Sequence, residues 1–255
     1  MASTKRPIVL AFIGSFVWWI FFTLSTLLIS PLVVLFSFVS TSMTGYKAAT
    51  IWARFNIWSL GVLCGLKYQV QGREHIPDLS GFIMMSKHQS TWETLALAFN
   101  LPPHIWVFKR ELQWLPFFGW ALWSVRPIAV NRSSKVSTLE QVVAQATKRM
   151  SEGMNVMIFP EGTRVAAGTK GRYKTGGSLL AERTGKPILP VAHNAGHFWP
   201  RKGFIKNAGL ITIRIGPLIE TAGRSAQDIN ETVETWIEAQ QDELDPDAVR
   251  QLSDS

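Results

Sequence analysis

The stretch "GFIMMSKHQSTWE", residues 81–93, decides the fold class because an apolar run changes there into a polar turn and then into a helix start. Its first part is almost entirely apolar, as are "NVMIF" at 155–159 and "ILPVA" at 188–192. A strand with no alternation of polar and apolar residues is buried on both faces. These runs therefore indicate an α/β sheet that is covered by helices on each side.

Similar β-like runs recur along the chain, at 67–72, 81–86, 105–109, 127–131, 155–159, 188–193 and 210–216. Between them, the apolar positions from Leu139 to Met150 follow helical spacing, and 178–183 and 226–243 are further helical segments. We expect an α/β fold with a mostly parallel or mixed sheet flanked by helices. The predicted parts are membrane-associated hydrophobic helices at 1–66, an α/β domain at 67–220, and an acidic helix and tail at 221–255.

The N-terminal part carries no charged residue at positions 7–40. This apolar length exceeds both the ~20 residues that span a bilayer and the ~7–15 of a signal-peptide core. Pro31 is expected to split it into a spanning helix at 8–29 and a segment at 32–42 that is only ~16 Å long. A second apolar segment follows at 50–66. We therefore expect an N-terminal, membrane-anchoring helical segment before the α/β domain.

Basic residues lie on both sides of this anchor: Lys5 and Arg6 come before it, and Lys47 and Arg54 come later. Such residues favour the cytoplasmic side of a membrane. Both ends are therefore expected on that side, in a hairpin, a re-entrant helix or an interfacial helix pair. An ordinary single span would instead place the body of the protein outside.

The net charge of +8 is unevenly distributed over the 255 residues. Residues 1–219 carry 24 Lys/Arg and 8 Asp/Glu, a balance of +16, whereas residues 220–255 carry 2 and 10, a balance of −8. A basic body suits nucleic acid, anionic lipid or a phosphorylated substrate. No nucleic-acid motif is present, and the 11 tryptophans suit a membrane interface, so lipid or phosphate is favoured. The single cysteine, Cys64, rules out an internal disulfide.

His88 stands in the polar turn after an apolar strand, where α/β folds build their sites. Ser90 or Thr91 can cap the helix that begins near Trp92. With Glu93 in the first helical turn, its carboxylate can fix the imidazole tautomer and stabilise the imidazolium. A histidine in a polar turn is often only structural, so this stretch alone leaves both interpretations open.

The stretch "FPEGTR", residues 159–164, also follows a buried apolar strand. Gly162 permits a close backbone approach, and its amide and the neighbouring amides can point at an anion. Arg164 can bind a phosphate with two parallel hydrogen bonds. The alternative is a turn with a surface arginine.

A third stretch, "KRELQWLPFFG" at 109–119, is followed by "RPIAVNR" at 126–132. Cations such as Lys109 and Arg132 stand there beside aromatic and apolar residues, which suits a phosphate next to an acyl chain. An interfacial helix with snorkelling cations would give the same composition. A fourth stretch, "ILPV" at 188–191, indicates a core strand or the wall of a site.

In this order, the four stretches resemble the four sequence blocks of the glycerolipid acyltransferase family, whose best-known bacterial members are 1-acyl-glycerol-3-phosphate acyltransferases. The resemblance covers about residues 80–217, and "FPEGTR" matches its block in full. The first block of the family is a histidine, four residues and an aspartate. Glu93 stands here in place of that aspartate, and its extra methylene puts in doubt how tightly His88 is oriented.

The resemblance implies a catalytic pair in which His88 deprotonates a glycerol hydroxyl of the acceptor and Glu93 orients the imidazole. The resulting oxygen attacks an acyl thioester directly, without an acyl-enzyme. Backbone amides near Glu161 and Gly162 would stabilise the oxyanion, and Thr163 belongs to the same site wall. The residues implied to hold the acceptor phosphate are Arg164, Lys109 and Arg132.

The implied substrates are lysophosphatidic acid and an acyl thioester, carried by coenzyme A or by an acyl carrier protein. The expected surroundings are a membrane, by the resemblance a bacterial inner membrane with the catalytic domain on its cytoplasmic side. No cofactor, metal or nucleic acid is expected.

Other classes of protein fit the sequence less well. A serine hydrolase would need a G-x-S-x-G elbow, and "GGSLLA" at 176–181 does not supply one. His193 and His197 have the spacing of metal ligands, but no carboxylate is near them and the residues between them are a poor helix. A lipid-binding scaffold would not need His88 together with "FPEGTR". Another lysolipid acceptor stays an alternative within the enzyme class.

Overall fold

The computed structural model describes residues 6–39, 42–109, 128–130 and 135–245. Within them, one seven-stranded sheet has the strand order β1-β7-β6-β2-β5-β3-β4. The strands are β1 (Leu66–Gln71), β2 (Ile83–Ser86), β3 (His104–Lys109), β4 (Ile128–Val130), β5 (Asn155–Ile158), β6 (Ile188–His193) and β7 (Gly209–Ile215). All neighbours are parallel except β6 and β7, so the sheet is mixed. The predicted fold class is confirmed, and each predicted strand lies within two residues of an observed one.

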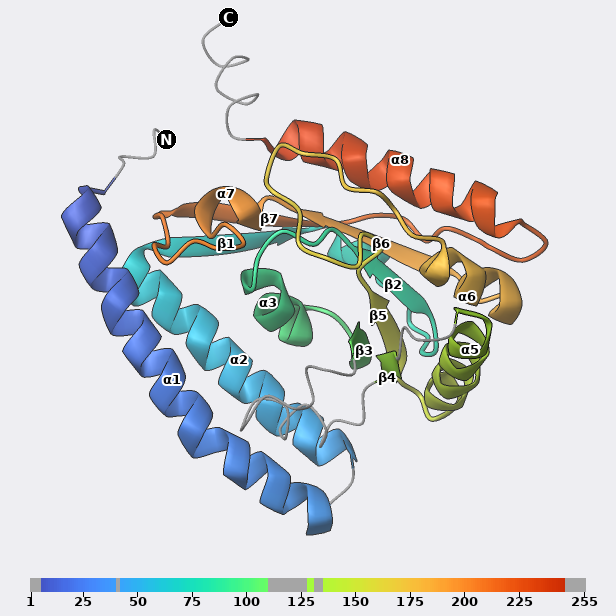
Figure 1. Cartoon of the computed structure of the whole chain (residues 1–255), viewed down its shortest axis with the longest axis horizontal. Helices are drawn as coiled ribbons and strands as arrows, with labels where there is room; N and C mark the ends of the chain where they lie inside the picture. The colour runs from blue at the N-terminus through green and yellow to red at the C-terminus, as the bar shows by residue number, and fades with distance from the viewer. Residues whose placement is uncertain (1–5, 40–41, 110–127, 131–134, 246–255) are drawn as a thin grey trace, which may run out of the picture.

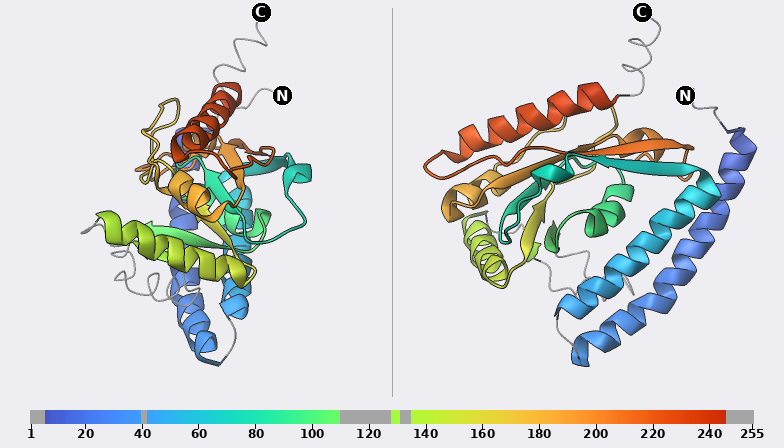
Figure 2. Two further views of the ribbon diagram at one scale, coloured as in Figure 1. Left: turned by 90° about the vertical axis from the view of Figure 1, so that its right-hand side faces the viewer. Right: turned by 180° about the vertical axis from the view of Figure 1, so that it is seen from behind.

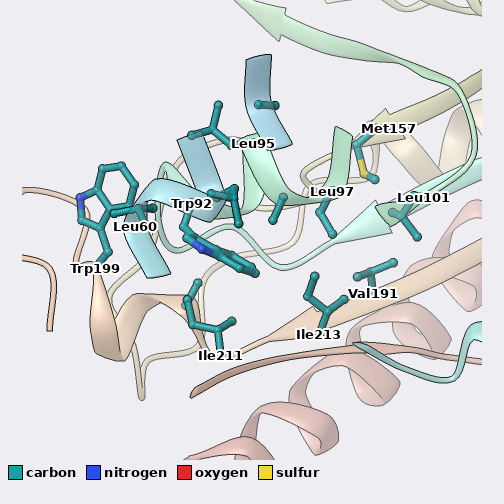
Figure 3. Packing of buried hydrophobic residues seen from close by; sticks show 14 of the residues in the cluster. Leu60, Trp92, Leu95, Leu97, Leu101, Met157, Val191, Trp199, Ile211 and Ile213 are labelled. Atoms are coloured by element: carbon teal, nitrogen blue, oxygen red, sulfur yellow. The ribbon is translucent and has the colours of Figure 1, made fainter. Parts of the chain in front are cut away.

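Helices cover both faces of the sheet, because the central strands are apolar on both sides (Figures 1 and 2). In β2, Met84 packs into one core, whereas Ile83 and Met85 pack into the other. The first core lies under α2 (Ser42–Cys64) and α3 (Trp92–Asn100), and Figure 3 shows Trp92 among the side chains of this core. The second core lies under α5 (Lys135–Ser151), α6 (Gly176–Thr184) and α8 (Ala226–Leu244).

Local chemistry explains the end of α6 and the start of α8. α6 ends at Gly185, whose φ of 62° is the left-handed conformation that glycine adopts most easily. α8 begins after Ser225, whose Oγ accepts the N–H of Asp228 at 3.2 Å. α7 (Ala195–Phe198) and the 3₁₀ turn η1 (Arg73–His75) are short connections. The division of the chain into parts at residues 66 and 220 stays a prediction.

The N-terminal segment differs from the prediction at Pro31. α1 (Ile8–Val39) continues through this proline without a break. Proline removes one backbone N–H, which weakens a helix, but Ser30 and Val33 on either side of it are buried. Packing therefore holds both halves in one helix, as is tolerated in apolar helices. Ile8–Leu35 is long and apolar enough to cross a membrane, and it is the one such helix in the described part of the chain.

α1 packs along α2 and is fastened to the sheet domain (Figure 1). The helices approach closely at Gly14, where a Cβ would lie 2.4 Å from the carbonyl oxygen of Leu63. On the domain side, Lys206 is fully buried, and its backbone N–H donates to Ser15 Oγ of α1 at 2.8 Å. Its ammonium lies among aromatic rings, 3.8 Å from the ring centroid of Trp19 and 4.8 Å from that of Trp199. This lysine therefore joins the connection between β6 and β7 to α1 by cation–π contacts.

Candidate active site

The candidate site lies at the carboxyl ends of two neighbouring parallel strands. β2 ends at Ser86 and leads into His88, and β5 ends at Ile158 and leads into residues 159–164. Parallel strands end at the same edge of a sheet, so these two stretches meet there. The N–H of Val165 donates to the carbonyl oxygen of His88 at 2.8 Å, which joins the two stretches directly.

The structure places Glu93 in contact with the His88 imidazole. Glu93 Oε1 lies 2.8 Å from His88 Nδ1, and the same oxygen accepts the backbone N–H groups of Gln89 at 2.9 Å and Ser90 at 2.8 Å. Ser90 Oγ in turn accepts the N–H of Trp92 at 3.2 Å. The Ser90 hydroxyl and the Glu93 carboxylate thus accept backbone N–H groups at the start of α3 that the helix itself leaves without a partner. This turn accommodates the extra methylene of the glutamate and keeps its carboxylate on the imidazole.

The imidazole of His88 is fixed by its neighbours but keeps one nitrogen free. Its ring stacks on Phe159 with centroids 3.8 Å apart and an interplanar angle of 9°, and Phe159 stacks in turn on Trp106 at 5.3 Å. When Nδ1–H donates to Glu93, Nε2 is the proton acceptor, and Nε2 has no hydrogen-bond partner among the described residues. The side chain is 16% exposed, so an incoming hydroxyl has access to it.

The charge of Glu93 is maintained although the carboxylate is fully buried. Burial by itself raises the pKa of Glu93, but the nearby His193, the hydrogen-bonded His88 and the N–H of Ser90 lower it below its ordinary value overall. His193 is buried as well, and burial lowers its pKa. The Nε2–H of His193 donates to the carbonyl oxygen of Lys87 at 2.9 Å, which fixes the start of the turn.

Glu161 lies behind the turn that carries His88. Its Oε2 accepts the N–H of His88 at 3.0 Å, and its Oε1 lies 3.1 Å from the ammonium of Lys87. Burial raises the pKa of Glu161 to about 7, against the lowering effect of Lys87. By these two contacts, the Glu161 side chain holds the backbone of His88 and the side chain of Lys87 in place.

The geometry at Gly162 differs from the expectation of an oxyanion donor. Gly162 has a φ of 64°, and its N–H donates to the carbonyl oxygen of Phe159 at 3.0 Å. That amide is already hydrogen-bonded within the turn, and the oxyanion role of Gly162 stays a prediction. The backbone amides of Glu161 and Thr163 donate to no backbone carbonyl within the described residues, so the oxyanion role stays a prediction for them.

The three predicted phosphate ligands have different outcomes. Arg164 Nη1 donates to Thr91 Oγ1 at 2.7 Å, which brings its guanidinium beside the turn that carries His88. Lys109 is the last residue of β3, two strands from β2, and only its backbone is described. Arg132 lies outside the described residues. The phosphate-binding roles of these residues stay predictions.

Several groups that contact the turn of His88 were not predicted from sequence patterns. Lys87 has a fully buried side chain that donates to Glu238 of α8, and Gln241 of the same helix accepts from Gln89 Nε2. The position of Lys87 directly after an apolar strand was a weak signal of burial. No signal in α8 distinguishes Glu238 from the other acidic residues of that helix.

Comparisons with known proteins agree on one family. The family model described as Acyltransferase matches residues 67–194. The chain is 42% identical over 198 residues to a 1-acyl-sn-glycerol-3-phosphate acyltransferase of Pseudomonas aeruginosa, covering 76% of this chain and 77% of the relative. A protein of the same name from Borreliella burgdorferi is 34% identical, covering 66% of each chain.

The fold also has a match among solved structures. The crystal structure of the 1-acyl-sn-glycerophosphate (LPA) acyltransferase PlsC from Thermotoga maritima superposes with a TM-score of 0.77. The match covers 91% of this chain and 95% of the other at 20% identity. At that identity, the superposition shows a shared fold, including the arrangement of helices around the sheet.

Proposed function

Because this chain belongs to the acyltransferase family, we propose that it transfers a fatty acyl group from a thioester to the free hydroxyl of 1-acyl-glycerol-3-phosphate, giving phosphatidic acid. The observation that carries the proposal is the contact of 2.8 Å between His88 Nδ1 and Glu93, which leaves Nε2 available as a base. The names of the relatives support the choice of acceptor.

In the proposed reaction, His88 Nε2 takes the proton of the acceptor hydroxyl as its oxygen attacks the thioester carbonyl. The carbon–sulfur bond then breaks, and the imidazolium returns the proton to the leaving thiolate. Glu93 keeps the imidazole in the Nδ1–H tautomer and stabilises its positive charge while it exists. No side chain becomes acylated, because the acceptor oxygen itself is the nucleophile.

The acceptor phosphate is proposed to bind at Arg164, with Lys109 and Arg132. The position of the Arg164 guanidinium, 2.7 Å from Thr91 at the start of α3, supports this assignment. A phosphate there would lie near the turn of His88. Arg164 would then exchange its contact with the neutral Thr91 hydroxyl for a charge-assisted, bidentate contact with the phosphate.

We further propose that α1 and α2 attach the protein to the cytoplasmic face of a bacterial inner membrane. The exposed apolar residues of α1, such as Leu28 at 70% and Ile8 at 66%, support membrane contact. Lipid substrates would then reach the site from the bilayer, and the thioester would arrive from the cytosol on coenzyme A or on an acyl carrier protein.

The test is acyl transfer by the purified protein in detergent, with a panel of lysolipids and both types of thioester. Lysophosphatidic acid should be acylated, and His88→Ala should abolish the activity without loss of the folded protein. His75→Ala is the matched control, since His75 contacts the carbonyl oxygen of Ile215 in β7, two strands away from β2. If only a different lysolipid is acylated, that lysolipid is the acceptor in place of lysophosphatidic acid. Full activity of His88→Ala would refute the mechanism.

A further inference from the structure

We propose that Glu238 of α8 is a positioning residue for acyl transfer, which acts through Lys87 and Glu161 on the backbone of His88. This inference rests on the proposed function. It assigns a role to the acidic C-terminal helix, which contributes no residue to the four sequence blocks at 86–93, 109–132, 159–164 and 188–191.

The first step is the burial of Lys87. Its side chain is 0% exposed, and its ammonium lies 2.7 Å from Glu238 Oε1 and 3.1 Å from Glu161 Oε1. A buried ammonium is tolerated only when it is paired and hydrogen-bonded. Lys87 is also the residue next to His88, so the place where its side chain is held constrains the backbone that carries the imidazole.

Second, Glu161 contacts both Lys87 and His88. One of its oxygens faces the Lys87 ammonium, and the other accepts the N–H of His88. A single carboxylate therefore links the side chain of one residue to the main chain of the next. Movement of Lys87 would move Glu161, and both would change the direction in which the imidazole leaves the backbone.

The third step is the contribution of α8. Glu238 Oε1 also accepts the hydroxyl of Tyr173 at 2.7 Å, which fixes the carboxylate that holds Lys87. Three residues later, on the same face of α8, Gln241 accepts from Gln89 Nε2 at 2.7 Å and donates to the carbonyl oxygen of His193 at 3.1 Å. This face of α8 thus contacts the residues on both sides of His88.

The simpler alternative is that Glu238 only neutralises a buried charge and stabilises the fold. The two roles differ in what they change. A stabilising residue affects the melting temperature, whereas a positioning residue also affects turnover by the protein that remains folded. Misplacement of a reacting group by about 1 Å can cost about a hundredfold in rate.

The experiment uses the full chain in detergent and compares Glu238→Gln with Glu234→Gln. Both variants remove one carboxylate charge from α8, but Glu234 pairs with Lys170, which is 62% exposed. Glu238→Gln should lower kcat by at least about tenfold with an acceptor KM within about twofold of the original. Glu234→Gln should keep both constants. An unchanged kcat for Glu238→Gln, with or without a lower melting temperature, would overturn the proposal.

A second variant covers the case in which Glu238→Gln does not fold. Gln241→Ala removes the contact with Gln89 without leaving an unpaired charge. It should also lower kcat, by a smaller factor than Glu238→Gln does. An unchanged kcat would show that α8 does not position the turn.

A spectroscopic measurement separates this proposal from the proposed function. In protein labelled with ¹⁵N-histidine, the Nδ1–H signal of His88 is assigned by its loss in His88→Ala. Glu238→Gln should shift or broaden that signal, and Glu234→Gln should not. If the unaltered protein acylates no lysolipid, the proposed function fails, but the signal still tests the positioning. An unchanged signal in Glu238→Gln would contradict it.

Discussion

Replacement of Glu93 by glutamine tests the candidate site most directly, because it removes one charge and almost no volume. In the folded protein, Glu93 Oε1 accepts from His88 Nδ1 and from two backbone N–H groups, and Oε2 accepts from Ser90 at 3.0 Å. Glutamine keeps one acceptor oxygen. The side-chain NH₂ of the glutamine must then point either at the N–H of Ser90 or at the imidazole. Both of these groups are donors in the native arrangement, so one donor would face another.

The size of the effect follows from these contacts. A hydrogen bond to a charged group contributes about 1.5–3 kcal/mol. Loss of the one that stabilises the imidazolium should therefore lower kcat about ten- to a hundredfold. The acceptor KM should change much less, because Glu93 is buried and does not face the substrate. Glu93→Asp keeps the charge but draws the carboxylate back toward the helix, so we expect a smaller loss.

The assay is the initial rate of acyl transfer over a range of both substrates, with the melting temperature measured on the same samples. Glu140→Gln on α5 serves as the control for a loss of charge, since Glu140 is exposed and lies far from the turn in the sequence. If Glu93→Gln melts at a lower temperature but keeps its kcat within twofold, the carboxylate only caps α3, and the reasoning about the imidazolium is refuted.

Three further variants test other parts of the structure. Arg164→Ala should raise the acceptor KM well above the change in the thioester KM, and equal changes would argue against a phosphate contact. Glu161 has its pKa raised to about 7, so its stabilising contribution is complete below the ordinary carboxyl pKa and is lost as pH rises through about 7. The free energy of unfolding of the original protein relative to Glu161→Gln should therefore fall between pH 5 and pH 8; a constant difference would contradict the raised pKa. Gly14→Ala places a Cβ against Leu63 and should cost about 1–3 kcal/mol of stability by overpacking, which chemical denaturation would measure.

The strands were predictable because their signal is local. Runs such as "NVMI" and "ILPVAH" are buried at every position of β5 and β6, and that composition is sufficient to place them in the middle of a covered sheet. The contact between His88 and Glu93 was predictable for the same reason. The two residues are five positions apart, and the turn and helix start between them determine whether their side chains meet.

The remaining features depend on residues that are distant in sequence. Lys87 and Glu238 are 151 positions apart, and nothing in the sequence around either one specifies the other. Pro31 was expected to end a helix by its own chemistry, but packing on both sides of it prevails. Gly162 was assigned from its freedom of conformation, whereas the partner of its N–H depends on how the turn closes on Phe159.

The contacts of Lys206 with aromatic rings of α1 make this helix one wall of the folded protein. Trp18 is 0% exposed and Ala11 is 3% exposed, so truncation before α2 would open the core that packs against the sheet. The opposite stripe of the same helix, with Val9 at 63% and Leu28 at 70%, supports nothing inside the protein. A water-soluble version for biochemical work should therefore keep the helix at full length and replace only the residues of that outer stripe with polar ones.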